Sequence, residues 1–155
     1  MSPKSTSLDA DRMDDAMSHT VSRARMTGIG RVLVIVYAVM AIGATGRSFV
    51  QIVRRFEEAP LAYSLSAAAA VVYILATLAL ILADRPGWYR MAWIAIVFEL
   101  SGVIVVGALS FLAPSLFAHD SVWSYFGMGY VFIPLVLPVF GIWWLVKNRP
   151  ERIRA

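Results

Sequence analysis

The chain contains no cysteine and only two histidines, His19 and His119. Without cysteine there is no disulfide, no thiol redox chemistry and no Cys-bound metal or iron–sulfur cluster. Because both histidines lie outside the long apolar segments, the chain cannot offer two imidazoles to a haem among its own helices. The sequence also shows no nucleophile–base pair and no metal-binding cluster, so we expect neither an enzyme nor a bound metal or cofactor.

Charged residues are scarce as well, at 15% of 155 residues, whereas 59% are hydrophobic. Four stretches carry almost no charge: residues 32–53, broken by Arg47, and residues 59–83, 91–113 and 121–146. Each is long enough to cross a bilayer, which takes about 20 helical residues. A soluble domain of this length could not bury so much apolar surface. The sequence therefore predicts an all-α membrane protein with four transmembrane helices.

We expect these helices at about 31–55, 60–83, 88–113 and 121–146, within a transmembrane domain at 29–147. The connections between them are short, which favours an up-down bundle of antiparallel neighbours. Residues 1–28 are polar and lack apolar periodicity, so they are predicted to form a flexible cytoplasmic tail. Residues 148–155 are predicted to form a short basic cytoplasmic tail.

The distribution of charge predicts the orientation of the chain. The formal net charge is +4, but the basic residues are not gathered into a nucleic-acid-binding patch, and we expect no nucleic acid. Most of the 14 Lys and Arg residues lie in the N-terminal part, in the connection at 84–90 and at the C-terminal end. By the positive-inside rule this pattern places both termini in the cytoplasm of a multi-pass plasma-membrane protein.

Glu99 is the only ionisable side chain between residues 91 and 113. A charged side chain at the centre of a membrane helix costs roughly 2.5–3.5 kcal/mol on insertion scales, so an acid there is a candidate functional residue. Its helical face is made mostly of small residues such as Ala92, Ala95 and Gly102, which favours a direction into the bundle. Three roles stay open: a hydrogen bond that holds helices together, proton or cation handling, and a contact between subunits.

Arg47 is the predicted charged partner of Glu99, because it is the one basic residue set inside the first helix. Counting along both helices places Arg47 roughly 10 Å nearer the outer surface than Glu99. Long side chains could bridge that distance. Otherwise Arg47 extends toward the outer headgroups, and Glu99 meets a water or a hydroxyl such as that of Ser48 or Tyr73.

Arg47 also shares a helical face with Gln51 and Arg54, at the outer end of the first helix. Guanidinium groups suit two-point contacts with phosphate, so these three residues form a candidate site for an anion or a lipid headgroup. The alternative is that they line a seam between helices and are solvated at the interface.

Pro134 and Pro138 lie four residues apart in the fourth apolar stretch. Each proline removes a backbone donor and crowds the carbonyl one turn earlier, so we expect the fourth helix to be kinked or locally unwound in its middle.

Three segments carry a resemblance to a known group of proteins: ATGRS at 44–48, EAPLAY at 58–63, and the run from VWS at 122–124 through FG at 126–127 to PLVLP at 134–138. With them the chain resembles an uncharacterised family of small four-helix integral membrane proteins of actinobacterial type, over roughly residues 30–146. The resemblance implies a four-helix bundle and carries no activity, so no functional residue follows from it.

Three functions fit this sequence. The first is a non-enzymatic accessory protein or subunit of a membrane assembly, bound to membrane lipids and to a second copy or another membrane protein. The second is a small oligomeric transporter that uses Glu99 for proton or cation coupling; four-helix multidrug exporters are similar in size, but their glutamate lies in the first helix. The third is an anionic-lipid-binding protein that uses Arg47, Gln51 and Arg54.

Overall fold

A computed structural model describes residues 28–117 and 119–149. These residues form helices and connections, without a strand, in the order α2 (Gly28–Arg55), η1 (Phe56–Glu58), α3 (Pro60–Ile81), α4 (Pro86–Leu112), η2 (Pro114–Leu116), η3 (Ser124–Tyr130) and α5 (Ile133–Lys147). α2, α3 and α4 begin and end within a few residues of the expected ranges 31–55, 60–83 and 88–113. The predicted tails at 1–28 and 148–155 lie outside the described residues, except for 28, 148 and 149.

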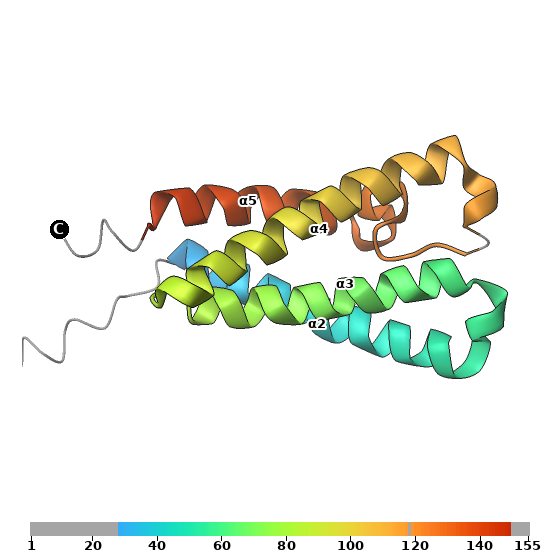
Figure 1. Ribbon diagram of the computed structural model, residues 1–155, viewed down its shortest axis with the longest axis horizontal. Helices are drawn as coiled ribbons and strands as arrows, with labels where there is room; N and C mark the ends of the chain where they lie inside the picture. The colour runs from blue at the N-terminus through green and yellow to red at the C-terminus, as the bar shows by residue number, and fades with distance from the viewer. Residues whose placement is uncertain (1–27, 118, 150–155) are drawn as a thin grey trace, which may run out of the picture.

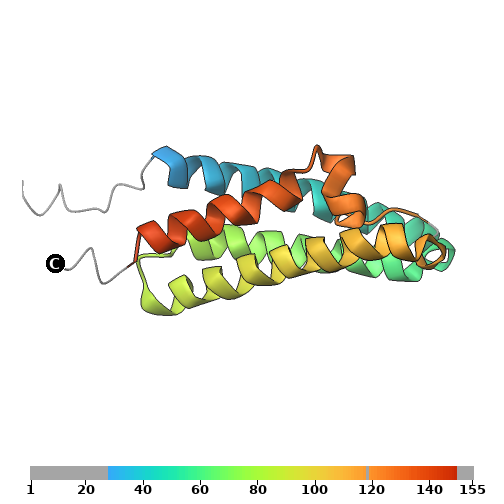
Figure 2. The same ribbon diagram turned by 90° about the horizontal axis from the view of Figure 1, so that it is seen from above.

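The four α-helices lie side by side, and each runs opposite to the one before it (Figures 1 and 2). α2 packs on α3, α3 on α4 and α4 on α5, and α5 also contacts α2. The start of α2 and the end of α5 lie at the same end of the structure as the turn between α3 and α4 (Figure 1). The other end, called here the η1 end, holds η1, η2 and the segment that leads into η3.

Three helical segments are long and apolar enough to cross a membrane: Gly28–Glu58, Pro60–Ile81 and Pro86–Leu112. A fourth span is present if η3 and α5, which meet at an angle of 98°, are counted together. Large apolar side chains point outward along these helices, among them Val39, Ile42 and Phe111, which are 62%, 75% and 63% exposed. The chain therefore has the helix lengths and the apolar surface of a membrane protein.

Small side chains let α2 and α3 approach each other closely. Ten positions of α3 are buried, and five of them are alanine: Ala62, Ala69, Ala70, Ala76 and Ala79. The buried serine hydroxyls donate to the carbonyl one turn earlier, as Ser48 does to Ala44 at 2.7 Å and Ser66 does to Ala62 at 3.0 Å. In a medium without water, small residues and internal hydrogen bonds of this kind favour helix contact.

The fourth helix is shorter than predicted, which corrects the range 121–146. Regular α-helix begins only at Ile133, and Pro134 lies in its first turn. A proline in a helix interior clashes with the carbonyl four residues earlier, whereas the first turn tolerates it. Pro134 therefore follows directly after the bend of 98° between η3 and α5, which lies near the middle of the predicted range 121–146. Pro138 lies inside α5, as the sequence indicates.

The chain enters α5 through a left-handed turn. Tyr125, Phe126 and Gly127 have φ values of 52°, 59° and 77°, and Val131 and Phe132 follow with 55° and 59°. Left-handed backbone costs an L-residue roughly 1–2 kcal/mol, so contacts elsewhere must hold this segment in place.

Gly107 of α4 provides one such contact. A Cβ atom at Gly107 would lie 2.5 Å from Cδ1 of the Phe126 ring and 2.8 Å from the Phe126 backbone nitrogen. Only glycine therefore lets the turn sit against α4.

We expect Gly107→Ala to destabilise the protein by about 1–3 kcal/mol, because the added methyl group overpacks the contact with Phe126. Gly43→Ala is the matched control, since it also adds a methyl group to a helix but meets no atom within 4 Å. Thermal unfolding of the two variants in detergent measures the difference. Equal midpoints would contradict the packing that the structure shows.

Candidate functional site

A cavity of about 490 Å³ lies at the η1 end of the helices. Its walls come from the last turns of α2, from the first turn of α3 and from the segment before η3. We call it the basic cavity, and its lining residues are Arg47, Val50, Gln51, Arg54, Arg55, Tyr63, His119 and Asp120. All three residues of the predicted anion site, Arg47, Gln51 and Arg54, lie in this lining.

Arg47 is fixed at the wall of the basic cavity by two contacts. Its Nη2 donates a hydrogen bond to the backbone carbonyl of Asp120 at 2.7 Å. Its guanidinium carbon lies 5.9 Å from the ring centroid of Tyr130, within range of a cation–π interaction. These contacts join the last turns of α2 to η3 and to the segment before it, which are far away in the sequence.

Two residues that line the basic cavity each have a buried polar atom without a hydrogen-bond partner among the described residues: Nε of Arg47 and Oε1 of Gln51. The two residues lie one helical turn apart on the same face of α2. A buried donor or acceptor without a partner costs about 1–3 kcal/mol, more for a charged group. Arg47 and Gln51 therefore each combine a place in the lining with a polar atom whose hydrogen bonding is incomplete.

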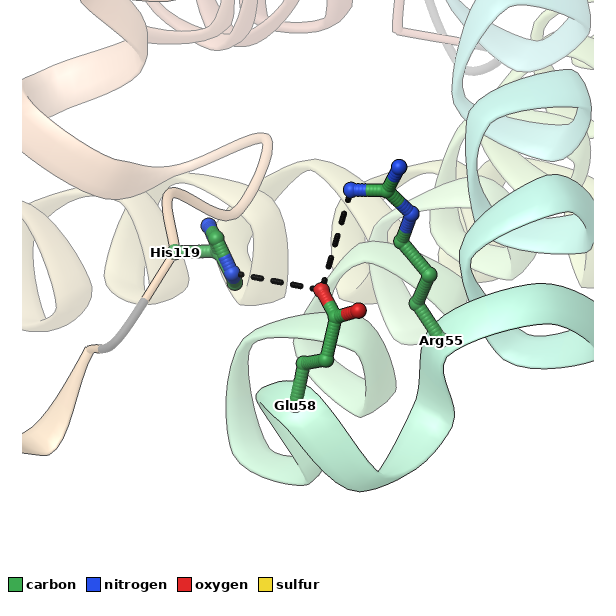
Figure 3. A network of polar contacts seen from close by, with 3 residues as sticks. All are labelled: Arg55, Glu58 and His119. Atoms are coloured by element: carbon green, nitrogen blue, oxygen red, sulfur yellow. Dashed lines mark ion pairs between the residues drawn. The ribbon is translucent and has the colours of Figure 1, made fainter.

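The carboxylate of Glu58 lies between two lining residues (Figure 3). Its Oε2 is 3.8 Å from Nη1 of Arg55 and 3.5 Å from Nε2 of His119. The imidazole of His119 is stacked on Tyr63, with ring centroids 6.1 Å apart. These contacts join η1, α3 and the segment before η3 at the edge of the cavity.

Arg47 and Arg54 differ from Arg55 in that neither has a carboxylate within 4.0 Å in the described part of the chain. Arg47 is half-buried, and its hydrogen bond to Asp120 goes to a neutral backbone carbonyl. Two guanidinium groups that share one cavity without a paired carboxylate leave an excess of positive charge. An anion with several oxygen atoms would complete this arrangement.

Glu99 lies elsewhere, in the centre of the packed helices, and is 0% exposed. The hydroxyl of Tyr37 on α2 donates a hydrogen bond to its Oε2 at 2.7 Å, while its Oε1 is buried without a partner among the described residues. On α3 the ring of Tyr73 lies 6.3 Å from that of Tyr37, and its hydroxyl accepts a hydrogen bond from Nε1 of Trp123 at 3.2 Å. This polar group connects α2, α3, α4 and the segment before η3.

The predicted pair of Glu99 and Arg47 is wrong, because the structure gives each side chain a different partner. Arg47 lies ten residues beyond Tyr37, or about 15 Å farther along α2. Tyr37 is at the depth of Glu99, and Arg47 is at the η1 end.

Sequence reasoning missed Tyr37 and several lining residues of the basic cavity. Tyr37 could have been found by counting along the helices. At about 1.5 Å per residue from the inner ends of the first and third apolar stretches, Tyr37 and Glu99 differ in membrane depth by only about 5 Å. No signal of this kind pointed to Tyr63, His119 and Asp120, because only the path of the connections brings them to α2. In residues 28–117 and 119–149 no group of three or more His, Cys, Asp or Glu side chains could hold a metal ion.

No family model, no curated protein and no solved structure matches this chain. The resemblance to four-helix membrane proteins of actinobacterial type stays a prediction.

The Tyr37–Glu99 hydrogen bond predicts a graded response to substitution. Tyr37→Phe removes the donor and leaves a second buried carboxyl oxygen without a partner, so it should destabilise the protein by about 1 kcal/mol. Glu99→Gln should be milder, because the amide oxygen still accepts a hydrogen bond.

The measurement is thermal unfolding in detergent, with Tyr125→Phe as the control that removes a hydroxyl from the half-buried Tyr125. If Tyr37→Phe unfolds at the same temperature as Tyr125→Phe, the hydrogen bond to Glu99 contributes nothing to stability.

Proposed function

We propose that this chain is a non-enzymatic multi-pass membrane protein that binds the anionic headgroup of a membrane lipid in its basic cavity. The observation that carries this proposal is the pair of guanidinium groups of Arg47 and Arg54 in one cavity, without a carboxylate partner in the described part of the chain. The orphaned Nε of Arg47 adds a donor that a phosphate oxygen would satisfy.

The position of the cavity along the membrane normal supports a lipid as the ligand. Counted from Arg31 at about 1.5 Å per residue, Arg47 lies about 24 Å and Arg54 about 35 Å along α2. The two residues would thus bracket the far boundary of a hydrocarbon core about 30 Å thick, where phosphate groups lie. Phe49 and Val53, on the neighbouring face of α2, are 68% and 66% exposed and would contact the acyl chains.

The proposed topology is a four-helix up-down bundle with both termini in the cytoplasm of the plasma membrane. η3 and α5 together would form the fourth span. The excess of Lys and Arg in the predicted tails and in the connection at 84–90 supports this orientation. The start of α2 and the end of α5 lie together with that connection, which agrees with the charge distribution (Figure 1). The basic cavity would then face the outer leaflet.

The other two functions have less support from the geometry. A coupling carboxyl group must gain access to water on both sides, whereas Glu99 is 0% exposed and bonded to Tyr37, which favours a role in packing. A role as an accessory subunit, with a second copy or another membrane protein, stays a prediction. It is compatible with lipid binding, because a lipid in the basic cavity could lie at such a contact.

The double variant Arg47→Ala, Arg54→Ala should lose bound anionic lipid by about tenfold or more, since a hydrogen bond to a charged group contributes about 1.5–3 kcal/mol. Gentle purification followed by native mass spectrometry measures the lipid that remains bound.

Arg31→Ala is the matched control, because Arg31 is an exposed arginine on the same helix at the opposite end. Lipid retention that is equal in the double variant, the control and the native protein would rule out the basic cavity as the binding site.

A further inference from the structure

The charges around the basic cavity restrict the kind of anion it accepts. Three arginines, Arg47, Arg54 and Arg55, lie in the lining. Two carboxylates oppose them: Asp120 in the lining, and Glu58, which contacts Arg55 and His119. The three arginines and the two carboxylates together leave one positive charge. A phosphodiester carries one negative charge and would balance it, whereas a phosphate monoester carries roughly 1.5–2 negative charges at pH 7.

The two buried atoms without hydrogen-bond partners restrict the chemistry of the ligand further. Nε of Arg47 is a donor and requires an acceptor, and Oε1 of Gln51 is an acceptor and requires a donor. Side chains at this spacing have Cβ atoms about 5–6 Å apart, so both groups are within reach of one compact headgroup. The ligand must therefore present an anionic oxygen and, a few atoms away, a hydrogen-bond donor.

A hydroxyl group suits Gln51 better than an ammonium group does. A hydroxyl both donates and accepts, so it pairs with the amide of Gln51 whether the oxygen or the nitrogen faces the cavity. An ammonium group only donates, and it would place a further positive charge among Arg47 and Arg54. A zwitterionic headgroup would also leave the remaining charge of the cavity unbalanced.

From this geometry we propose that the basic cavity selects a phosphodiester whose headgroup carries hydroxyls, as in phosphatidylglycerol. The phosphodiester oxygens would lie on Arg47 and Arg54, and a headgroup hydroxyl on Gln51. A volume of about 490 Å³ is within the usual range for sites that enclose a small molecule. This assignment rests on the proposed function, since it names the lipid that the same cavity would bind.

The test is competition among lipids in nanodiscs that contain equal amounts of phosphatidylglycerol, phosphatidylethanolamine, phosphatidic acid and phosphatidylcholine. The lipids that stay bound are identified by native mass spectrometry. The native protein should retain phosphatidylglycerol in preference to the other three.

Gln51→Leu should reduce that preference about two- to tenfold, because a single neutral hydrogen bond is lost while the phosphate contacts remain. Gln51→Glu, which keeps the shape of the side chain, should weaken binding of every anionic lipid through charge repulsion. Arg31→Ala should leave the preference unchanged.

Two results would overturn the proposed preference for a phosphodiester with hydroxyls and leave lipid binding itself intact: equal retention of phosphatidylglycerol and phosphatidic acid, or enrichment of phosphatidic acid or phosphatidylethanolamine. A Gln51→Leu variant with undiminished preference would also overturn it. Loss of every lipid from the native protein would instead overturn the proposed function.

A second experiment tests whether the ligand is a lipid or a soluble molecule with the same headgroup. Glycerophosphoglycerol, added at increasing concentration, should displace phosphatidylglycerol only weakly, because it lacks the acyl chains that contact α2. If glycerophosphoglycerol bound as tightly as phosphatidylglycerol, the ligand would not need to be a membrane lipid, and that part of the proposal would be wrong.

Discussion

A bilayer core offers no water to the polar groups of the chain, and most features of this structure follow from that constraint. Each backbone donor and acceptor must find its partner within the protein, which confines the chain to helices wherever it crosses the hydrocarbon. The same requirement explains why buried serine hydroxyls bond to carbonyls of their own helix. It also explains why Glu99 lies in the centre of the helices and meets Tyr37 there.

Two groups of polar side chains in the described part of the chain have different physical roles. Glu99 and Tyr37 are enclosed, and their hydrogen bond joins α2 to α4, which are otherwise linked mainly through α3 and α5. Arg47, Gln51 and Arg54 lie at a helix end, where a cavity leaves polar atoms without partners. An enclosed group with a partner favours stability, whereas an open cavity with orphaned charged groups favours binding.

The left-handed turn before α5 couples these two groups. It packs against α4 at Gly107 and leads to Tyr130, which lies near the guanidinium group of Arg47. Trp123, just before this turn, reaches into the core and donates to Tyr73. The segment at residues 119–130 therefore closes the core on one side and contributes to the wall of the basic cavity on the other.

The sequence alone determined the approximate ranges of α2, α3 and α4, since these depend on runs of apolar residues that are local in the chain. It also singled out Glu99, Arg47, Gln51 and Arg54, because charged and polar groups stand out in such runs. The tertiary structure decided which of these groups meet. Glu99 bonds to Tyr37 and Arg47 to Asp120, because depth in the membrane and the path of the connections set the distances between side chains. The path of the connections is not visible in local sequence patterns, so the start of the fourth helix and the full lining of the basic cavity emerged only from the fold.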